Sequence, residues 1–255
     1  MNMDEIVKLI KLKKELSGLS DVVVLDVLEK ELKKFKIDPK LEELKKSDKK
    51  ILIKEVRAKL RRLVGRFTIA NKERLSLVEE ENTENLLSSH SSSNERLLFY
   101  PELRKIISDL KIKSILDLGC GLNPLALANQ NIEYYASDIN SSDLEVVDAF
   151  FKKEGMKGKT FVLDIRKKPL IFPKTDLTLI LKVFDIIETK GHKQAEYIIK
   201  TLDCKYILIS FPTKTLSGKA MNHPQRGWIE QLLNRLQFKF KTFSSNNEIF
   251  YLVEK

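Results

Sequence analysis

The sequence contains few of the residues that build metal sites and disulfide frameworks. It has 2 cysteines and 3 histidines in 255 residues, and they are scattered at Cys120, Cys204, His90, His192 and His223. A structural zinc site needs four such ligands at short spacings, so we expect no metal. Two widely separated cysteines also give no disulfide framework, which is typical of a reduced, cytoplasmic protein.

Long apolar runs are also absent. No stretch approaches the ~20 apolar residues that cross a bilayer, so we expect no membrane association. The first ten residues are amphipathic and partly acidic, unlike a secretory signal peptide. Hydrophobic residues nevertheless make up 42% of the chain, which is enough for a real core. The length allows one large domain and a smaller one.

Negative charge is in short supply, because 36 Asp and Glu face 46 Lys and Arg and leave a net charge of +10. Most of the surplus lies in positions 1–72, which hold twenty basic and twelve acidic residues. A basic surface attracts polyanions, and nucleic acid is the commonest polyanion in cytoplasm. Charge alone does not separate this interpretation from an ordinary solvated lysine-rich face.

The first third of the chain has helical periodicity and no strong strand signal. Helices are expected over Val22–Phe35, Pro39–Lys46 and Ile51–Val64, after an amphipathic start. Residues 1–67 are therefore predicted to form a small, basic, all-helical domain that docks RNA. Residues 68–110 are predicted to be a linker, because of the serine run at 88–93, followed by a helix that contributes to a ligand pocket.

Short apolar runs alternate with helical stretches over residues 111–255. Strands are expected at Ser114–Leu118, Glu133–Ser137, Thr160–Leu163, Leu177–Leu181, Tyr206–Ser210, Phe238–Phe243 and Ile249–Val253. The alternation predicts an α/β fold with a mostly parallel seven-stranded sheet covered by helices on both faces. A turn at 244–247 joins the last two strands as a hairpin, so one of them should be antiparallel.

The first of these strands runs into the segment ILDLGCGLNP at 115–124. Gly119 and Gly121 let the backbone turn tightly and approach a ligand, and Asp117 at the strand end can hold a cationic group. The pattern is not G-x-G-x-x-G, which disfavours a dinucleotide. A purely structural turn is the alternative interpretation.

Two more acids follow successive strands. Asp138 ends the second strand, where a carboxylate accepts hydrogen bonds from ribose hydroxyls, and Asp164 follows the third, where it suits an adenine amino group. Each aspartate alone is more often a helix cap. Because parallel strands end at one edge of the sheet, the three acids together predict a pocket for S-adenosylmethionine in a Rossmann-like class I methyltransferase domain.

Three further segments accompany this loop. They are HSSSNERL at 90–97, LILKVF at 179–184 and FPTKTLSGK at 211–219. With DLGCGLNPLA at 117–126, they resemble the 16S ribosomal RNA guanine-N7 methyltransferases of aminoglycoside resistance, the Arm/Rmt/Fmr group. The resemblance covers about residues 67–219, and the first and third segments are its most specific parts.

The resemblance implies S-adenosyl-L-methionine as cofactor and S-adenosyl-L-homocysteine as product. It places His90, Ser91 and Ser92 at the cofactor and Arg96 on its carboxylate, which a guanidinium fork suits. The other positions that match family cofactor residues are Phe67, Gly119, Asp138, Asp164, Ile165 and Leu181. Without the resemblance, Arg96 would be interpreted as an exposed helix arginine beside Glu95.

Applied to this sequence, the resemblance implies methylation of N7 of guanine 1405, in the decoding-site helix of 16S rRNA, by a monomer acting on the assembled 30S subunit. A guanine N7 has a free lone pair, so we name no catalytic acid or base. Alternatives are methylation of another RNA such as a tRNA, a non-catalytic ribosome-assembly or RNA-binding factor, and a small-molecule methyltransferase, which the basic helical domain disfavours.

Basic residues on two segments are candidates for contacts with RNA phosphates. They are Arg57, Arg61 and Arg62, on the last predicted helix of the N-terminal domain, and Lys214 and Lys219, on the loop after the fifth strand. Ordinary solvated lysines are the alternative for the loop pair. Trp228 could stack on the target base, although packing against the sheet is the stronger interpretation.

Overall fold

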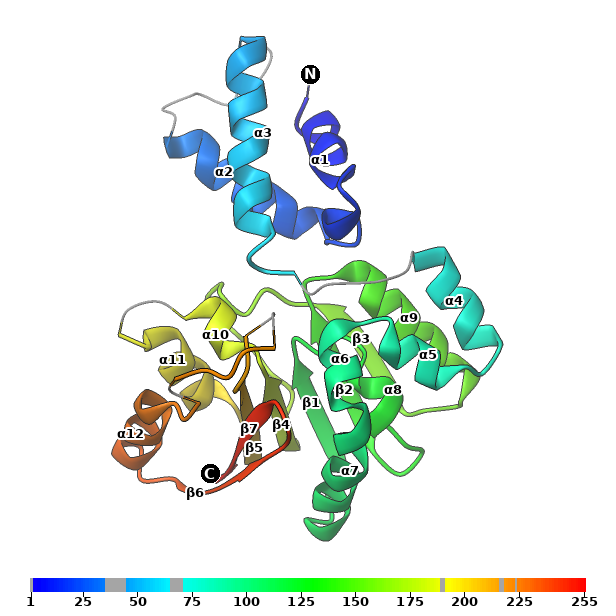
Figure 1. Ribbon diagram of the computed structural model, residues 1–255, viewed down its shortest axis with the longest axis vertical. Coiled ribbons are helices and arrows are strands. Elements are labelled where there is room, and N and C mark those ends of the chain that lie inside the picture. Colours follow the sequence, from blue (N-terminus) through cyan, green and yellow to red (C-terminus); the bar gives the residue numbers. More distant parts are fainter. Residues whose placement is uncertain (1, 35–44, 65–70, 189–190, 216–217, 223) are drawn as a thin grey trace.

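The computed structural model describes the chain except residues 1, 35–44, 65–70, 189–190, 216–217 and 223. Helices α1 (Met3–Lys11), α2 (Asp21–Lys34) and α3 (Lys46–Leu60), with a 3₁₀ turn η1 (Lys14–Leu16), form a group that stands apart from the sheet (Figure 1). Ile6, Ile10, Leu28 and Val56 are fully buried between them. The predicted helical N-terminal region is confirmed, while most of the predicted helix Pro39–Lys46 lies outside the described residues.

The segment after the helical domain differs from the predicted linker. It forms α4 (Asn71–Glu79), α5 (Thr83–Ser88), α6 (Ser91–Arg96), η3 (Leu97–Phe99) and α7 (Tyr100–Asp109). The prediction of a loop over the serine run is wrong. Asn82 caps the N-terminus of α5, and this helix buries Leu86 and Leu87 in the core on one face of the sheet. Ser89 bonds to a backbone carbonyl, so these serines end one helix and begin the next.

The sheet confirms the predicted topology. Its strands are β1 (Ser114–Leu118), β2 (Glu133–Asp138), β3 (Gly158–Val162), β4 (Thr175–Leu181), β5 (Cys204–Pro212), β6 (Lys239–Ser244) and β7 (Glu248–Glu254), in the order β3-β2-β1-β4-β5-β7-β6. β1 to β5 pair in parallel, and β7 lies between β5 and β6, antiparallel to both. The predicted hairpin therefore supplies the antiparallel strand.

Helices cover both faces of the sheet (Figure 1). One core joins α7, α8 (Asn123–Leu127) and α9 (Ser141–Lys153) to side chains such as Ile115. The other joins α10 (Phe184–Ile187), α11 (Lys193–Thr201) and α12 (Gly227–Arg235) to side chains such as Leu116. Neighbouring β1 residues thus face opposite cores, as the pleat requires. Among the described helices, none combines the length and apolar character that a membrane crossing needs.

Candidate functional site

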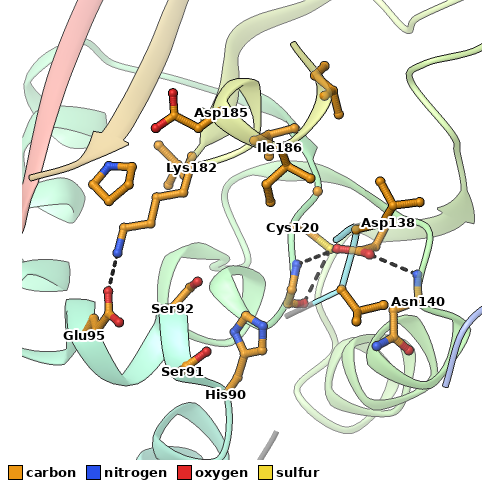
Figure 2. Close-up of a pocket in the computed structure, with 18 of the residues that line it drawn as sticks. His90, Ser91, Ser92, Glu95, Cys120, Asp138, Asn140, Lys182, Asp185 and Ile186 are labelled. Atoms are coloured by element: carbon orange, nitrogen blue, oxygen red, sulfur yellow. Dashed lines mark hydrogen bonds and ion pairs between the residues drawn. The ribbon is translucent and has the colours of Figure 1, made fainter. Parts of the chain in front are cut away.

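A cavity of about 950 Å³ lies at the carboxyl edge of the sheet. Its walls come from the ends of β1, β2 and β4, the loops after β3 and β5, helices α6 and α10, the turn between β6 and β7, and the end of the helical domain. Figure 2 shows His90, Ser91 and Ser92 at its floor, Asp138 and Asn140 on one side, and Lys182 with Glu95 on the other. Segments far apart in sequence therefore meet at one site.

The glycine loop after β1 has no room for side chains. Gly119 has a φ of 71° and Gly121 a φ of 48°. A Cβ at Gly119 would lie 2.7 Å from a methyl of Val183, and one at Gly121 would lie 2.8 Å from the His90 ring. Both glycines line the cavity, so the loop presents bare backbone to a ligand.

Asp138 ends β2 with a carboxylate that the backbone holds in place. Its Oδ2 accepts from the Gly121 amide at 3.0 Å, and its Oδ1 from the Asn140 amide at 2.9 Å. Burial raises the pKa of this carboxyl, although the backbone amides oppose the shift. A carboxylate oxygen can accept more than one hydrogen bond, so a fixed acceptor faces the cavity.

Asp164 lies in the loop after β3, not on the strand itself. Arg166 grips both of its oxygens, with Nε at 2.7 Å from Oδ1 and one terminal nitrogen at 2.6 Å from Oδ2. Asp164, Ile165 and Arg166 all line the cavity. The sequence pattern gave no indication of Arg166, because it occupies no strand end.

Arg96 is buried, with only 1% of its surface exposed, although it too lines the cavity. Its Nε donates to Glu248 at 2.9 Å, and another guanidinium nitrogen donates to Asn123 Oδ1 at 2.8 Å. Burial alone would lower the pKa of Arg96, but the Glu248 carboxylate raises it above its ordinary value. The interpretation of Arg96 as an exposed arginine beside Glu95 is wrong, because Glu95 pairs with Lys182.

A polar network continues beneath the cavity from Asn123. Its amide nitrogen faces Asp117 Oδ2 at 3.4 Å, and Tyr134 donates to the same oxygen at 2.8 Å. Burial raises the pKa of Asp117 to about 7. Its Oδ1 is buried and has no hydrogen-bond partner among the described residues, which is the setting in which proteins hold an ordered water molecule. Asp117 itself does not line the cavity.

His90 lies under the glycine loop, and its Nδ1 is 3.1 Å from Ser93 Oγ. Burial lowers the pKa of His90 to about 3, helped by the positive charges of Arg74 and Arg96. The ring is therefore neutral at physiological pH. Ser91 and Ser92 begin α6 and line the cavity, and Leu181 lines it from the end of β4.

Of the five residues predicted to contact RNA, three line the cavity and two do not. Arg61, Arg62 and Lys214 line the cavity. Arg57 does not line it; it donates to the carbonyl oxygens of Leu9 and Ile10 at the end of α1. Lys219 is exposed on the loop after β5 and also lies outside the lining. Phe67, predicted at the cofactor, lies outside the described residues.

Trp228 does not reach the cavity. Its ring packs edge-on against Phe184 and Phe211 and stacks on His192 at 4.0 Å between ring centres. It belongs to the core on the α10–α12 face, as the packing interpretation predicted.

Sequence reasoning missed Lys182, the residue that follows β4. It has a φ of 61°, unusual for a residue with a side chain, and its ammonium lies between Glu95 and Glu248 at the cavity wall. Backbone strain of this kind gathers at functional sites. Its place directly after a strand that ends at the ligand edge was the one available signal.

A family model described as ribosomal RNA methyltransferase (FmrO) matches residues 53–252. The chain belongs to the FmrO family of ribosomal RNA methyltransferases. The matched range begins within α3 and includes the helices that line the cavity and all of the sheet except the last two residues of β7. The family resemblance inferred from the four sequence segments is thereby confirmed.

Curated relatives and solved structures agree with the FmrO assignment. The 16S rRNA (guanine(1405)-N(7))-methyltransferase of Micromonospora echinospora is 31% identical over 182 residues, 66% of this chain and 64% of that protein. The match therefore spans slightly less than two thirds of that relative. The enzyme of the same name from Serratia marcescens is 29% identical over 174 residues, 66% of this chain and 68% of that one.

Two solved structures match all of this FmrO-family chain. The 16S rRNA methylase RmtB is covered to 99%, with a TM-score of 0.78 and 23% identity. The 16S rRNA methyltransferase RmtF, solved in complex with S-adenosyl-L-homocysteine, is covered to 98%, with a TM-score of 0.80 and 21% identity. At these identities the likeness establishes the fold, and the predicted methyltransferase architecture is confirmed.

Proposed function

We propose that the protein transfers a methyl group from S-adenosyl-L-methionine to N7 of a guanine in 16S rRNA, within the 30S subunit. The observation that carries the proposal is the single cavity in which the glycine loop, Asp138, Asp164 and helix α6 meet, in a chain of the FmrO family. The curated relatives named for guanine 1405 support that base as the target.

The residues at the cavity fit this cofactor. Asp138 is held by two backbone amides, as an acceptor for ribose hydroxyls should be, and Asp164 offers an acceptor to the adenine amino group. Ile165 and Leu181 add apolar walls. Gly119 and Gly121 bring bare backbone to the cavity, where a Cβ at either position would collide with Val183 or His90. When bound, the cofactor supplies an electrophilic methyl group on a sulfonium.

The amino-acid end of the cofactor would face helix α6. Ser91 and Ser92 offer hydroxyl donors there, and Arg96 offers guanidinium N–H groups to a carboxylate. Because Glu248 already balances the charge of Arg96, Arg96 would act chiefly as an oriented donor. The neutral His90 ring supports the loop from below.

The chemistry requires alignment more than proton transfer. Guanine N7 has a lone pair and no proton at neutral pH, so the chain's task is to hold N7 in line with the methyl donor. His90 is neutral and bonded to Ser93, which agrees with a structural role. The target base must leave its stack to reach the cavity. Arg61, Arg62 and Lys214 would meet the RNA backbone at the cavity's edge.

Methyl transfer from tritiated S-adenosylmethionine tests the substrate. Purified 30S subunits and bulk tRNA are incubated separately with the wild type and with Asp138→Ala. We expect label in 16S rRNA with the wild type and almost none with the variant. Label in tRNA alone would replace the ribosomal proposal with a tRNA methyltransferase. Absence of label from both, with cofactor binding intact, would favour a non-catalytic RNA-binding factor.

A further inference from the structure

The segment that follows β2 has one side in the cavity and the other against the helical domain. Asp138, Ile139 and Asn140 all line the cavity. The Ile139 side chain also packs against the hydrophobic core of the helical domain, and its carbonyl oxygen accepts from the Ser20 amide at 3.0 Å. The helical domain is therefore joined to the sheet at the residue next to Asp138.

An isolated antiparallel bridge extends this junction. Leu19 pairs with Asn140, and the Ser142 amide donates to the Gly18 carbonyl at 3.2 Å. The Asn140 amide donates to Asp138 Oδ1, and the Asn140 side chain caps α9. One residue thus pairs with the helical domain, fixes the Asp138 carboxylate and starts a helix of the sheet domain.

Gly18 allows the two chains to approach this closely. A Cβ at Gly18 would lie 2.5 Å from Asn140 Oδ1 and 3.0 Å from the Ser142 side chain. Any larger residue must push Asn140, Ser142 or the Gly18 turn out of place. The backbone amide of Asn140 donates to Asp138 Oδ1, so a push on Asn140 that shifts its backbone would be passed on to the carboxylate.

A second contact ties the loop of Asp164 to the same domain. Asp26 of α2 forms an ion pair with Lys167 at 3.1 Å. Burial would raise the pKa of Asp26, but hydrogen bonds from Lys30 and Lys167 lower it. Lys167 follows directly after Arg166, the residue that grips Asp164. The loop after Asp138 and the loop that bears Asp164 therefore both contact α2 or the turn before it.

We infer that the helical domain is a working part of the cofactor site, in which the turn Gly18–Ser20 positions the Asp138 carboxylate through Asn140. Cofactor affinity and the seating of the helical domain on the sheet are then linked, and such a linkage is reciprocal. Binding of RNA to the helical domain would then affect the position of the Asp138 carboxylate through the same backbone contacts. The inference rests on the proposed function, because it takes the ligand of Asp138 to be the S-adenosyl cofactor.

Gly18→Ala in the full-length protein tests this directly. S-adenosyl-L-homocysteine is titrated calorimetrically into the wild type, the variant and Gly227→Ala, whose added Cβ would meet nothing within 4 Å. We expect Gly18→Ala to bind about tenfold more weakly, within the usual range of coupling between sites, and Gly227→Ala to match the wild type. Equal affinity of all three proteins would overturn the inference.

Hydrogen exchange and a milder variant keep the test independent of folding in Gly18→Ala. In the wild type, S-adenosyl-L-homocysteine should slow exchange of the Ser20 and Ser142 amides, which bond across the junction. Asp26→Asn should weaken binding about two- to fivefold, as expected for a partly exposed ion pair. Its control is Asp21→Asn, which breaks an ion pair inside the helical domain.

Unchanged exchange at both amides, or equal effects of the two aspartate variants, would contradict the inference. The proposed function fails in a different way. A wild type that does not bind S-adenosyl-L-homocysteine at all would overturn the proposed function, and this inference with it.

Discussion

The floor of the cavity and the helical domain both place charged groups near the ligand site, but in different physical states. Arg96 and Glu248 form a buried ion pair, with side-chain exposures of 2% and 0%. Arg61 and Glu15, at the end of the helical domain, form a solvated pair with exposures of 46% and 41%. The buried pair has one geometry, whereas the solvated pair can open to meet another partner.

This difference matches the two proposed ligands. A small cofactor gains affinity from groups already fixed in place, because little ordering remains to be done on binding. RNA phosphates are bound through mobile, exposed cations whose contribution depends on salt. An arginine can therefore recognise a small cofactor where it is buried and fixed, and RNA phosphates where it is exposed and mobile.

Breaking the buried pair should have the largest effect. Arg96→Met leaves the Glu248 carboxylate buried without its main partner, although Lys182 lies 3.5 Å away. We expect a loss of about 3–5 kcal/mol in the free energy of unfolding, measured with urea. The double variant Arg96→Met, Glu248→Gln should recover much of it. A loss below ~1 kcal/mol for Arg96→Met would mean that the pair contributes no more than an exposed ion pair does.

The glycine loop allows strain and contact to be separated. Gly121→Ala and Gly155→Ala both force an L-residue to a positive φ, which costs roughly 1–2 kcal/mol, but only Gly121 faces a neighbour, the His90 ring. Urea unfolding should show a loss of stability in both variants, larger in Gly121→Ala because of the contact with His90. S-adenosyl-L-homocysteine titrations should show a loss of affinity only in Gly121→Ala. Equal affinities would mean that the loop does not shape the cofactor cavity.

The buried ring of His90 should make the stability of the protein depend on pH. The folded protein keeps His90 neutral down to a pH of about 3, whereas its ordinary pKa is 6.5. The unfolded chain therefore binds the proton first, and stability falls as the pH is lowered from 6.5 toward 3. His90→Asn should lose stability less steeply than the wild type over this interval, by urea unfolding at several pH values. Parallel curves would place the acid sensitivity elsewhere.

The solvated pair should matter least for stability. Arg61→Ala should change the free energy of unfolding by no more than about 1 kcal/mol and leave the affinity for S-adenosyl-L-homocysteine near that of the wild type. Its binding to 30S subunits should be weaker at low salt and show a shallower dependence on salt concentration. An unchanged salt slope in filter-binding assays would remove Arg61 from the RNA surface.

The sequence predicted the parts of the site that local pattern determines. Strand periodicity placed Asp138 at a strand end, and the glycine loop followed from Gly119 and Gly121. Local sequence pattern could not predict the partner of Arg96. Glu248 lies 152 residues away in the sequence, and it meets Arg96 only once β7 pairs with β5. The helices of the serine run were missed because burial of Leu86 and Leu87 outweighs the loop propensity of serine.

The central claim is that the strand-edge cavity delivers a methyl group to guanine N7. Nucleoside analysis of 16S rRNA, after incubation of 30S subunits with the enzyme and tritiated S-adenosylmethionine, tests it most directly. The account predicts label in 7-methylguanosine with the wild type and its loss with Asp138→Ala. Label in any other nucleoside, or undiminished 7-methylguanosine with the variant, would contradict it.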